Sequence, residues 1–196
     1  MSVPAATTRV LALDPMSRGF GFGVHEGPTN LVVWGIRNAP NNNPRALLRK
    51  ISELIALYQP EAIVIEDCRH VRSRRRQRVR AVITQVAALA TQDTEVQLIP
   101  AALVHSVFGT GRAVTKYQIA TLVAEHFPEV GYRLPPERKP WMPEDARFAI
   151  FDAMAFALTF YYCQDEVSER THQSPWTSSR CSGRSSRPDR SSEPGR

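Results

Sequence analysis

Cysteine is scarce in this sequence and carries no recognisable ligand pattern. The three cysteines, Cys68, Cys163 and Cys181, are odd in number and include no CxxC pair. This spacing argues against a disulfide framework and a zinc knuckle, and it favours a reducing cytosol. The histidines of the body of the chain show no ligand spacing either, and we expect ordinary packed or exposed side chains at His25, His70, His105 and His126.

Long apolar runs are also absent. The longest apolar stretch, residues 148–162, is interrupted by Asp152 and is too short to span a bilayer. Residues 1–9 lack the charged segment and the apolar core of a signal peptide. We therefore expect a soluble, cytoplasmic protein with no membrane partner.

The length of the chain favours one domain and a tail. With 196 residues, of which 42% are hydrophobic, the chain can bury one good core, so we expect a domain over residues 1–167. Residues 168–196 are rich in Ser, Arg and Pro, and we expect them to be disordered because they cannot offset the entropy of ordering.

The net charge of +6 is shared between these two parts. Six arginines and three acidic residues give the tail +3, which leaves +3 for the domain. A basic balance suits a polyanionic partner such as nucleic acid. The tail either adds nonspecific electrostatic affinity for that partner or is simply solvated.

Apolar runs separated by turns predict the strands. Residues 9–14, 20–25 and 31–36 are joined by connections so short that they imply antiparallel hairpins. Residues 62–66 are apolar at every position before an acid, as in a strand covered on both faces, and residues 95–99 form a fifth strand. We expect an α/β fold: a mixed sheet of three antiparallel strands and then parallel strands, flanked by helices.

Capping residues and periodicity predict the helices. Asn43 caps a helix that begins at Pro44 and ends before Pro60. Residues 115–127 form a further helix, and Pro143 opens the last one, which runs to about residue 163.

Three acids lie where an ionised group is costly. Asp14 and Glu66 end two apolar strands, and Asp152 interrupts the apolar last helix. Burial of an unpaired carboxylate costs several kcal/mol, and the usual compensation is a metal ion, a counter-ion or a raised pKa. Three such acids near one core predict a bound cation. Turn capping at Asp14 and an ion pair between Glu66 and nearby arginines are the alternatives.

Arginine is concentrated in one segment. Seven of the twelve residues 69–80 are arginine. Like charges at this density repel one another, which is hard to explain without a polyanion, although an ordinary solvated helix face is the alternative. We expect salt-sensitive, sequence-independent phosphate contacts from Arg72, Arg74, Arg75, Arg76 and Arg78.

Four segments, in order along the chain, resemble the RuvC group of Holliday junction resolvases in the RNase H-like superfamily. Residues 11–21 (LALDPMSRGFG) resemble the motif of the first strand of that group, and residues 65–66 (IE) its second acidic strand. Residues 107–116 (VFGTGRAVTK) are similar to its glycine loop and the following helix, and residues 151–158 (FDAMAFAL) to its terminal helix. The same glycine loop is a poor match to a nucleotide-binding phosphate loop.

The resemblance implies a nuclease of branched DNA, an endodeoxyribonuclease with a place in recombination and repair. Carboxylates would hold two Mg²⁺ ions, for which Mn²⁺ can substitute, with Asp14 bridging both ions and Glu66 and Asp152 each completing one side. The resemblance also assigns Arg112 and Lys116 to the DNA backbone near the scissile phosphate, with a solvated helix start as the alternative.

One position departs from the family pattern. The group usually carries an acid or a histidine three residues before the terminal Asp, and this chain has Ala149 there. Asp145 is the candidate replacement and Glu144 a second one. If the helix begins at Pro143, Asp145 lies two turns from Asp152, about 10 Å along the axis. The alternative is that both acids interact with the helix dipole.

Several functional alternatives remain open. In the RuvC group the helix after the second acidic strand contributes to a dimer interface, so Val82, Val86 and Leu89 either pair two subunits or pack in the core. Trp34 and Trp141 are expected to pack, although an aromatic near the site could stack on an unpaired base. A noncatalytic nucleic-acid binder and an RNA-processing nuclease are the rival functions. The chain is too short for the two lobes of an actin-like ATPase.

Overall fold

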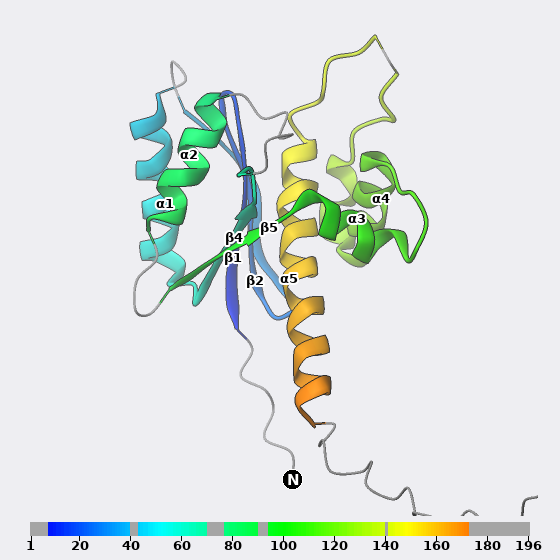
Figure 1. The fold of residues 1–196 in the computed structure, drawn as a ribbon. Coiled ribbons are helices and arrows are strands. Elements are labelled where there is room, and N and C mark those ends of the chain that lie inside the picture. The colour runs from blue at the N-terminus through cyan, green and yellow to red at the C-terminus, as the bar shows by residue number, and fades with distance from the viewer. Residues whose placement is uncertain (1–7, 40–42, 70–76, 90–93, 140, 173–196) are drawn as a thin grey trace, which may run out of the picture.

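A five-stranded mixed sheet forms the centre of the molecule (Figure 1). The structure is a computed structural model that describes residues 8–39, 43–69, 77–89, 94–139 and 141–172. In the order β3-β2-β1-β4-β5, antiparallel pairs join β1 to β2 and β2 to β3, and parallel pairs join β1 to β4 and β4 to β5. The predicted mixed sheet is confirmed. Its strands are β1 (Arg9–Met16), β2 (Gly19–Glu26), β3 (Leu31–Asn38), β4 (Ala62–Glu66) and β5 (Glu95–Ile99).

Helices cover both faces of this sheet. Figure 1 shows α1 (Pro44–Tyr58) and α2 (Gln77–Ala87) on one face and α5 (Phe148–His172) along the other. Outside α5 lie α3 (Ala101–Gly109), α4 (Lys116–His126) and the 3₁₀ segment η2 (Pro128–Arg133). Among the described residues, no helix combines the length and the apolar character needed to cross a membrane.

The alternation of side chains along the central strands builds two cores. Leu11 and Leu13 of β1 pack with Ile63 and Ile65 of β4 beneath α1 and α2. The intervening residues of both strands belong to a second core, which α5 dominates. Strands that are buried on both faces explain the nearly continuous apolar runs in the sequence.

The helix expected after Asn43 forms as predicted. Pro44 is its first residue, and the side-chain oxygen of Asn43 accepts a hydrogen bond from the backbone nitrogen of Arg45 at 3.0 Å. This bond satisfies one of the free donors at the helix start.

The structure differs from the sequence-based expectation at two helices. Residues 101–109 form α3, where no helix was predicted because the apolar run was too short for a clear helical period; its last residues overlap the segment 107–116 that resembles the glycine loop. The last helix begins at Phe148, not at Pro143, because Asp145 and Arg147 pair with each other in a turn before it. It continues to His172, past the predicted domain boundary at residue 167, and residues 173–196 lie outside the described residues.

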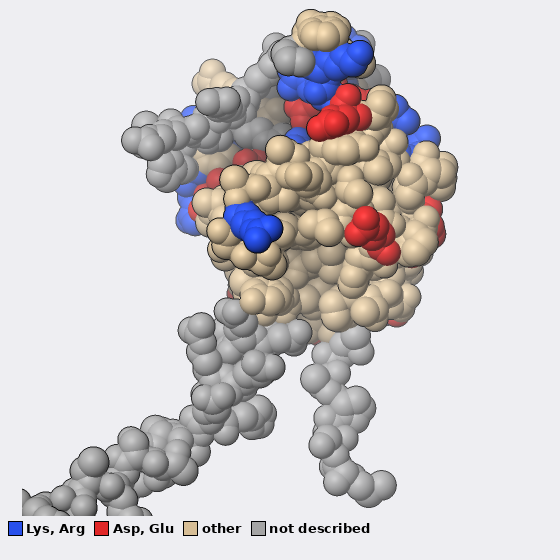
Figure 2. Space-filling view, turned by 90° about the vertical axis from the view of Figure 1, so that its right-hand side faces the viewer, with Lys and Arg blue, Asp and Glu red and all other residues tan. Residues whose placement is uncertain are grey.

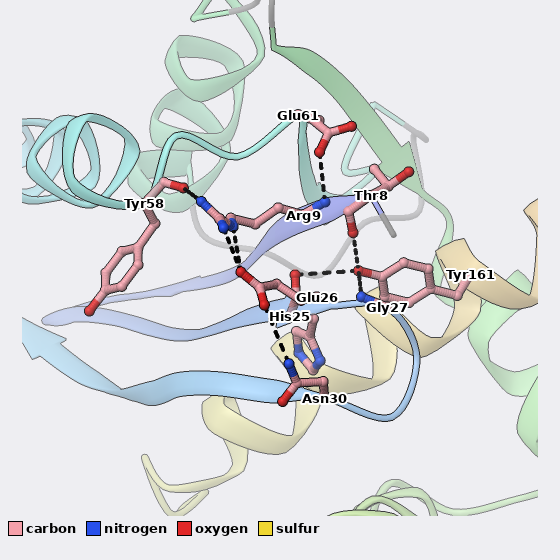
Figure 3. A network of polar contacts seen from close by, with 9 residues as sticks. All are labelled: Thr8, Arg9, His25, Glu26, Gly27, Asn30, Tyr58, Glu61 and Tyr161. Carbon is pink, nitrogen blue, oxygen red and sulfur yellow. Dashed lines mark hydrogen bonds and ion pairs between the residues drawn. The ribbon is translucent and has the colours of Figure 1, made fainter. Parts of the chain in front are cut away.

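A polar network fastens the end of the sheet where β1 begins (Figure 3). The guanidinium of Arg9 donates from Nε to Oε1 of Glu26 at 2.9 Å and from Nη1 to the carbonyl oxygen of Tyr58 at 2.9 Å. The hydroxyl of Tyr161 donates to the carbonyl oxygen of Thr8 at 2.8 Å. These bonds connect β1 with β2, α1 and α5, so α5 is held at the end of the sheet remote from Asp14.

Candidate functional site

Asp14 and Glu66 project from neighbouring strands toward the same face of the sheet. Ala12 of β1 and Val64 of β4 are partners in the parallel register, and both belong to the core under α5. Because side chains alternate along a strand, the residues two positions further on face the same way. Asp14 and Glu66 are those residues, and they therefore lie at the carboxyl ends of adjacent strands, on the α5 side.

Asp152 joins them from α5, which lies unusually close to β2. Gly21 is the register partner of Asp14, and a Cβ atom at Gly21 would overlap the carbonyl oxygen of Ala149. The missing side chain thus allows the first turn of α5 to rest on the sheet. Asp14 is almost completely buried, with 2% of its surface exposed, whereas the side chain of Asp152 keeps 19%.

Lys116 places an ammonium group among these carboxylates. Its Nζ lies 2.6 Å from Oδ2 of Asp152 and also contacts Oε1 of Glu144. Burial opposes the charge, but the interactions with Asp152 and Glu144 and the nearby charge of Asp14 together raise the pKa of Lys116 above its ordinary value. In this structure, a lysine of the chain itself supplies a cation beside these acids.

Local capping fixes the position of Lys116. Thr115 is the N-cap of α4: its hydroxyl accepts from the backbone nitrogen of Gln118, and its own backbone nitrogen donates to the Gln118 side chain at 2.8 Å. This reciprocal pair is a capping box, a motif that sets where a helix begins. Lys116 is the first residue of α4, so the capping box determines where its side chain leaves the backbone.

The two acids before α5 have different partners. Glu144 contacts Lys116, whereas the carboxylate of Asp145 binds Arg147, with Oδ2 at 2.7 Å from Nη2. Hydrogen bonds from the Arg147 side chain lower the pKa of Asp145 below its usual range. Of the two candidate substitutes for the missing acid at Ala149, Glu144 is therefore the one connected to Asp152 through a shared partner.

A cavity of about 180 Å³ opens beside the Lys116–Asp152 pair. Its polar lining residues are Glu66, His105, Lys116 and Asp152. Nδ1 of His105 lies 3.0 Å from the carbonyl oxygen of Val114, and since a carbonyl oxygen only accepts, Nδ1 carries the proton. No sequence pattern indicates that His105 belongs with these acids, because α3 and α5 meet only in the tertiary structure.

The donor set suits a hard divalent cation by its chemistry, since Mg²⁺ and Mn²⁺ prefer carboxylate oxygens. In the part of the chain that the structure describes, however, no three side chains of His, Cys, Asp or Glu converge closely enough to form a metal site. Lys116 occupies one carboxylate oxygen of Asp152. A metal ion could use that oxygen only if the ammonium moved away.

The predicted phosphate-binding residues are only partly visible. Arg72, Arg74, Arg75 and Arg76 lie outside the described residues, as does the side chain of Arg78. Arg112 is exposed just beyond α3. Figure 2 shows a largely neutral surface toward the viewer, with a cluster of Lys, Arg, Asp and Glu side chains at the top and separate charged side chains lower on the face and along its edges.

The helix that follows the arginine segment contributes to the chain's own core. Val82 and Val86 are buried in the core beneath α1 and α2, and the partly buried Leu89 packs against the same core. This arrangement agrees with the core-packing alternative for these three residues.

The topology defines the class of protein. A sheet of three antiparallel strands followed by two parallel ones, with acids at the carboxyl ends of its central strands and on the final helix, is the RNase H-like fold in the form seen in RuvC-type resolvases.

Comparisons with known proteins identify the relatives within that class. RuvC of Thermus thermophilus superimposes with a TM-score of 0.57 at 20% identity, over 81% of this chain and 96% of that one. The yeast mitochondrial Holliday junction resolvase Ydc2 gives 0.59 at 14% identity, over 87% and 85%. A curated crossover junction endodeoxyribonuclease RuvC from Alkalilimnicola ehrlichii is 39% identical over 66 residues. That match covers 30% of this chain and 40% of the relative. No protein-family model matches.

These likenesses in sequence and fold confirm the resemblance to RuvC-like Holliday junction resolvases that the motifs indicated. The curated match spans well under two thirds of the relative's length.

Proposed function

We propose that this chain is an endonuclease that hydrolyses phosphodiester bonds of branched DNA, with a four-way Holliday junction as the preferred substrate. The observation that carries the proposal is the common orientation of Asp14 and Glu66 at adjacent strand ends, opposite Asp152 on α5. The likeness to junction resolvases supports it.

Asp14, Glu66 and Asp152 would hold Mg²⁺ or Mn²⁺. When bound, such ions would supply Lewis-acid chemistry, lowering the pKa of a water molecule and stabilising charge on the leaving oxygen. Asp14 is suited to hold a cation because its side chain is buried near the end of a strand, which holds ligands rigidly.

Lys116 would exchange its contact with Asp152 for a contact with the DNA backbone. For Asp152 to bind a cation, the ammonium must leave its oxygen, and a phosphate oxygen of the DNA is the natural new partner for it. Arg112 and the arginines of residues 72–78 would neutralise further phosphates, with affinity that falls as salt rises.

The first experiment measures cleavage of a labelled four-way junction, a matched duplex and an RNA–DNA hybrid with Mg²⁺ or Mn²⁺. We expect paired nicks in the junction and a loss on the order of 100-fold or more in Asp14→Asn, because metal activation of water is removed. Asp67→Asn is a matched control, since Asp67 adjoins Glu66 in sequence but pairs with Arg69. Preferential cutting of the hybrid would instead favour an RNA-processing nuclease.

A noncatalytic nucleic-acid binder is the second candidate, favoured by Ala149 and by the Lys116–Asp152 ion pair. Calorimetric titration with Mn²⁺ separates the two functions. Binding that disappears in Asp14→Asn supports the nuclease, whereas junction binding without any Asp14-dependent metal binding or cleavage supports the alternative.

The role of Asp145 is tested in the same assays. If Asp145 completes the ligand set, Asp145→Asn should weaken Mn²⁺ binding and cleavage together. If Glu144 does so, Glu144→Gln should have that effect while Asp145→Asn loses only the pairing with Arg147.

A further inference from the structure

Residues 134–139 and 141–147, between η2 and α5, project beyond the body of the molecule (Figure 1). They include a solvent-exposed tryptophan. Trp141 is 77% exposed, and Met142 beside it is 39% exposed. Removing an indole from water is favourable, so an exposed indole leaves that contribution to stability or binding unused unless something covers it.

The segment has its own internal support around Trp141. The backbone nitrogen of Met142 donates to the carbonyl oxygen of Lys139 at 3.0 Å, and Nε of Arg138 donates to the carbonyl oxygen of Met142 at 2.6 Å. Nζ of Lys139 lies 5.5 Å from the centre of the indole ring. The indole therefore lies next to the Lys139 ammonium, and Arg138 is bonded to the backbone of the residue that follows it.

The end of the same segment nearest α5 contacts the candidate site. Glu144 contacts Lys116, which in turn pairs with Asp152. Two residues lie between Trp141 and Glu144, so their Cα atoms are at most about 11 Å apart. Trp141 is thus joined by a short stretch of chain to Glu144, whose carboxylate shares Lys116 with Asp152.

Tyr132 provides an internal comparison. It is also 77% exposed and also has a cation over its ring, since the guanidinium of Arg133 lies 5.9 Å from the ring centre. Its ring, however, packs against Trp34 of β3 at 5.8 Å between centres. Trp141 has no aromatic neighbour of this kind among the described residues, and its ring partner there is Lys139.

We propose that Trp141 stacks on an unpaired base of the DNA substrate next to the scissile phosphate, while Arg138 and Lys139 contact the adjoining backbone. This inference rests on the proposed function and names how that site would select branched or opened DNA. An aromatic ring flanked by cations is the arrangement that binds unpaired nucleotides, because every base offers a π face and every nucleotide a phosphate. Arg138 and Lys139 form no ion pair within the described part of the chain, which leaves their charge available to phosphates.

The test is binding in EDTA, so that cleavage plays no part. Affinities are measured for a four-way junction, a duplex with a short single-stranded gap and a fully paired duplex. Trp141→Ala should lower affinity for the gapped duplex and the junction about tenfold and leave the paired duplex unchanged. Trp141→Phe should retain most of the wild-type affinity for these two DNAs. Tyr132→Ala, the matched control, should leave all three affinities unchanged.

Two further readouts separate stacking from charge. Lys139→Ala should reduce the slope of log affinity against log salt by about one, whereas Trp141→Ala should leave the slope unchanged. A 5-iodouracil placed in the gap should photocrosslink to Trp141, and the same base in the paired duplex should not.

Equal losses on all three DNAs, or no loss on any, would overturn the proposal. So would a Trp141→Ala protein that binds DNA normally but no longer self-associates in analytical ultracentrifugation, because Trp141 would then contact a second copy. Failure of the nuclease proposal looks different: it is the absence of Asp14-dependent cleavage, which these binding measurements do not require.

Discussion

The ammonium of Lys116 lies 2.6 Å from Oδ2 of Asp152 and joins that carboxylate to Glu144. One positive charge thereby links the last helix of the fold, the start of α4 and the segment before α5. If Asp152 is a metal ligand, the chain's own cation and the metal ion compete for it.

Removal of this cation should strengthen metal binding. In Lys116→Met, the carboxylates lose their internal partner, so we expect Mn²⁺ to bind roughly tenfold more tightly, a gain of about 1.4 kcal/mol, while cleavage falls because the phosphate contact is lost. Isothermal titration checks the affinity. Lys50→Met is the control, since Lys50 donates to the backbone oxygen of Asn38. Weaker Mn²⁺ binding in Lys116→Met would show that the lysine supports the site and does not compete for it.

A methyl group at Gly21 should displace α5. The added Cβ would overlap the backbone of Ala149, which cannot move without the helix. We expect Gly21→Ala to lower the free energy of unfolding by about 2–4 kcal/mol and to weaken Mn²⁺ binding through Asp152. Gly131→Ala is the matched control, because a Cβ added at Gly131 would meet no atom within 4 Å. Urea unfolding of both variants measures the difference, and equal stabilities would contradict this account of the close contact.

Buried His25 should make the protein sensitive to acid. Burial, and secondarily the charge of His126, lower the pKa of His25 to about 4 from an ordinary 6.5. The unfolded chain therefore takes up a proton at a higher pH than the folded one. Stability is fully present above pH 6.5 and declines as the pH falls toward 4, by about 3 kcal/mol for this group.

The variant His25→Leu isolates that contribution. Both ring nitrogens of His25 lack a hydrogen-bond partner among the described residues, so Leu should stabilise the protein by about 1 kcal/mol at pH 7.5. The advantage of the variant should grow between pH 6.5 and 4, as measured by urea unfolding. An advantage that does not change with pH would rule out His25 as the titrating group.

The capping box at Thr115 should set the stability of α4. Thr115→Ala removes the acceptor for the Gln118 backbone nitrogen and should cost about 1 kcal/mol, whereas Thr115→Ser keeps the hydroxyl and most of the stability. Thermal unfolding compares the two. If Ala and Ser behave alike, the cap does not hold the start of this helix.

Local sequence patterns predicted much of the fold. The apolar runs ending in Asp14 and Glu66, the short turns between the first three strands and the cap at Asn43 predicted the mixed sheet and its first helix. Alternation along a strand is a local property, but the shared face of Asp14 and Glu66 also depends on the register between β1 and β4.

Local sequence patterns did not predict the contacts between segments that are distant in the chain. No spacing indicates that His105 lines a cavity with Glu66 and Asp152, that Gly21 admits the backbone of Ala149, or that Lys116 pairs with Asp152. These relationships depend on how helices pack on the sheet. Residue type and order along the chain specify the acids, the apolar runs and the helix caps. Which of these residues meet depends on the folded arrangement, because packing sums many weak contacts between residues far apart in the chain.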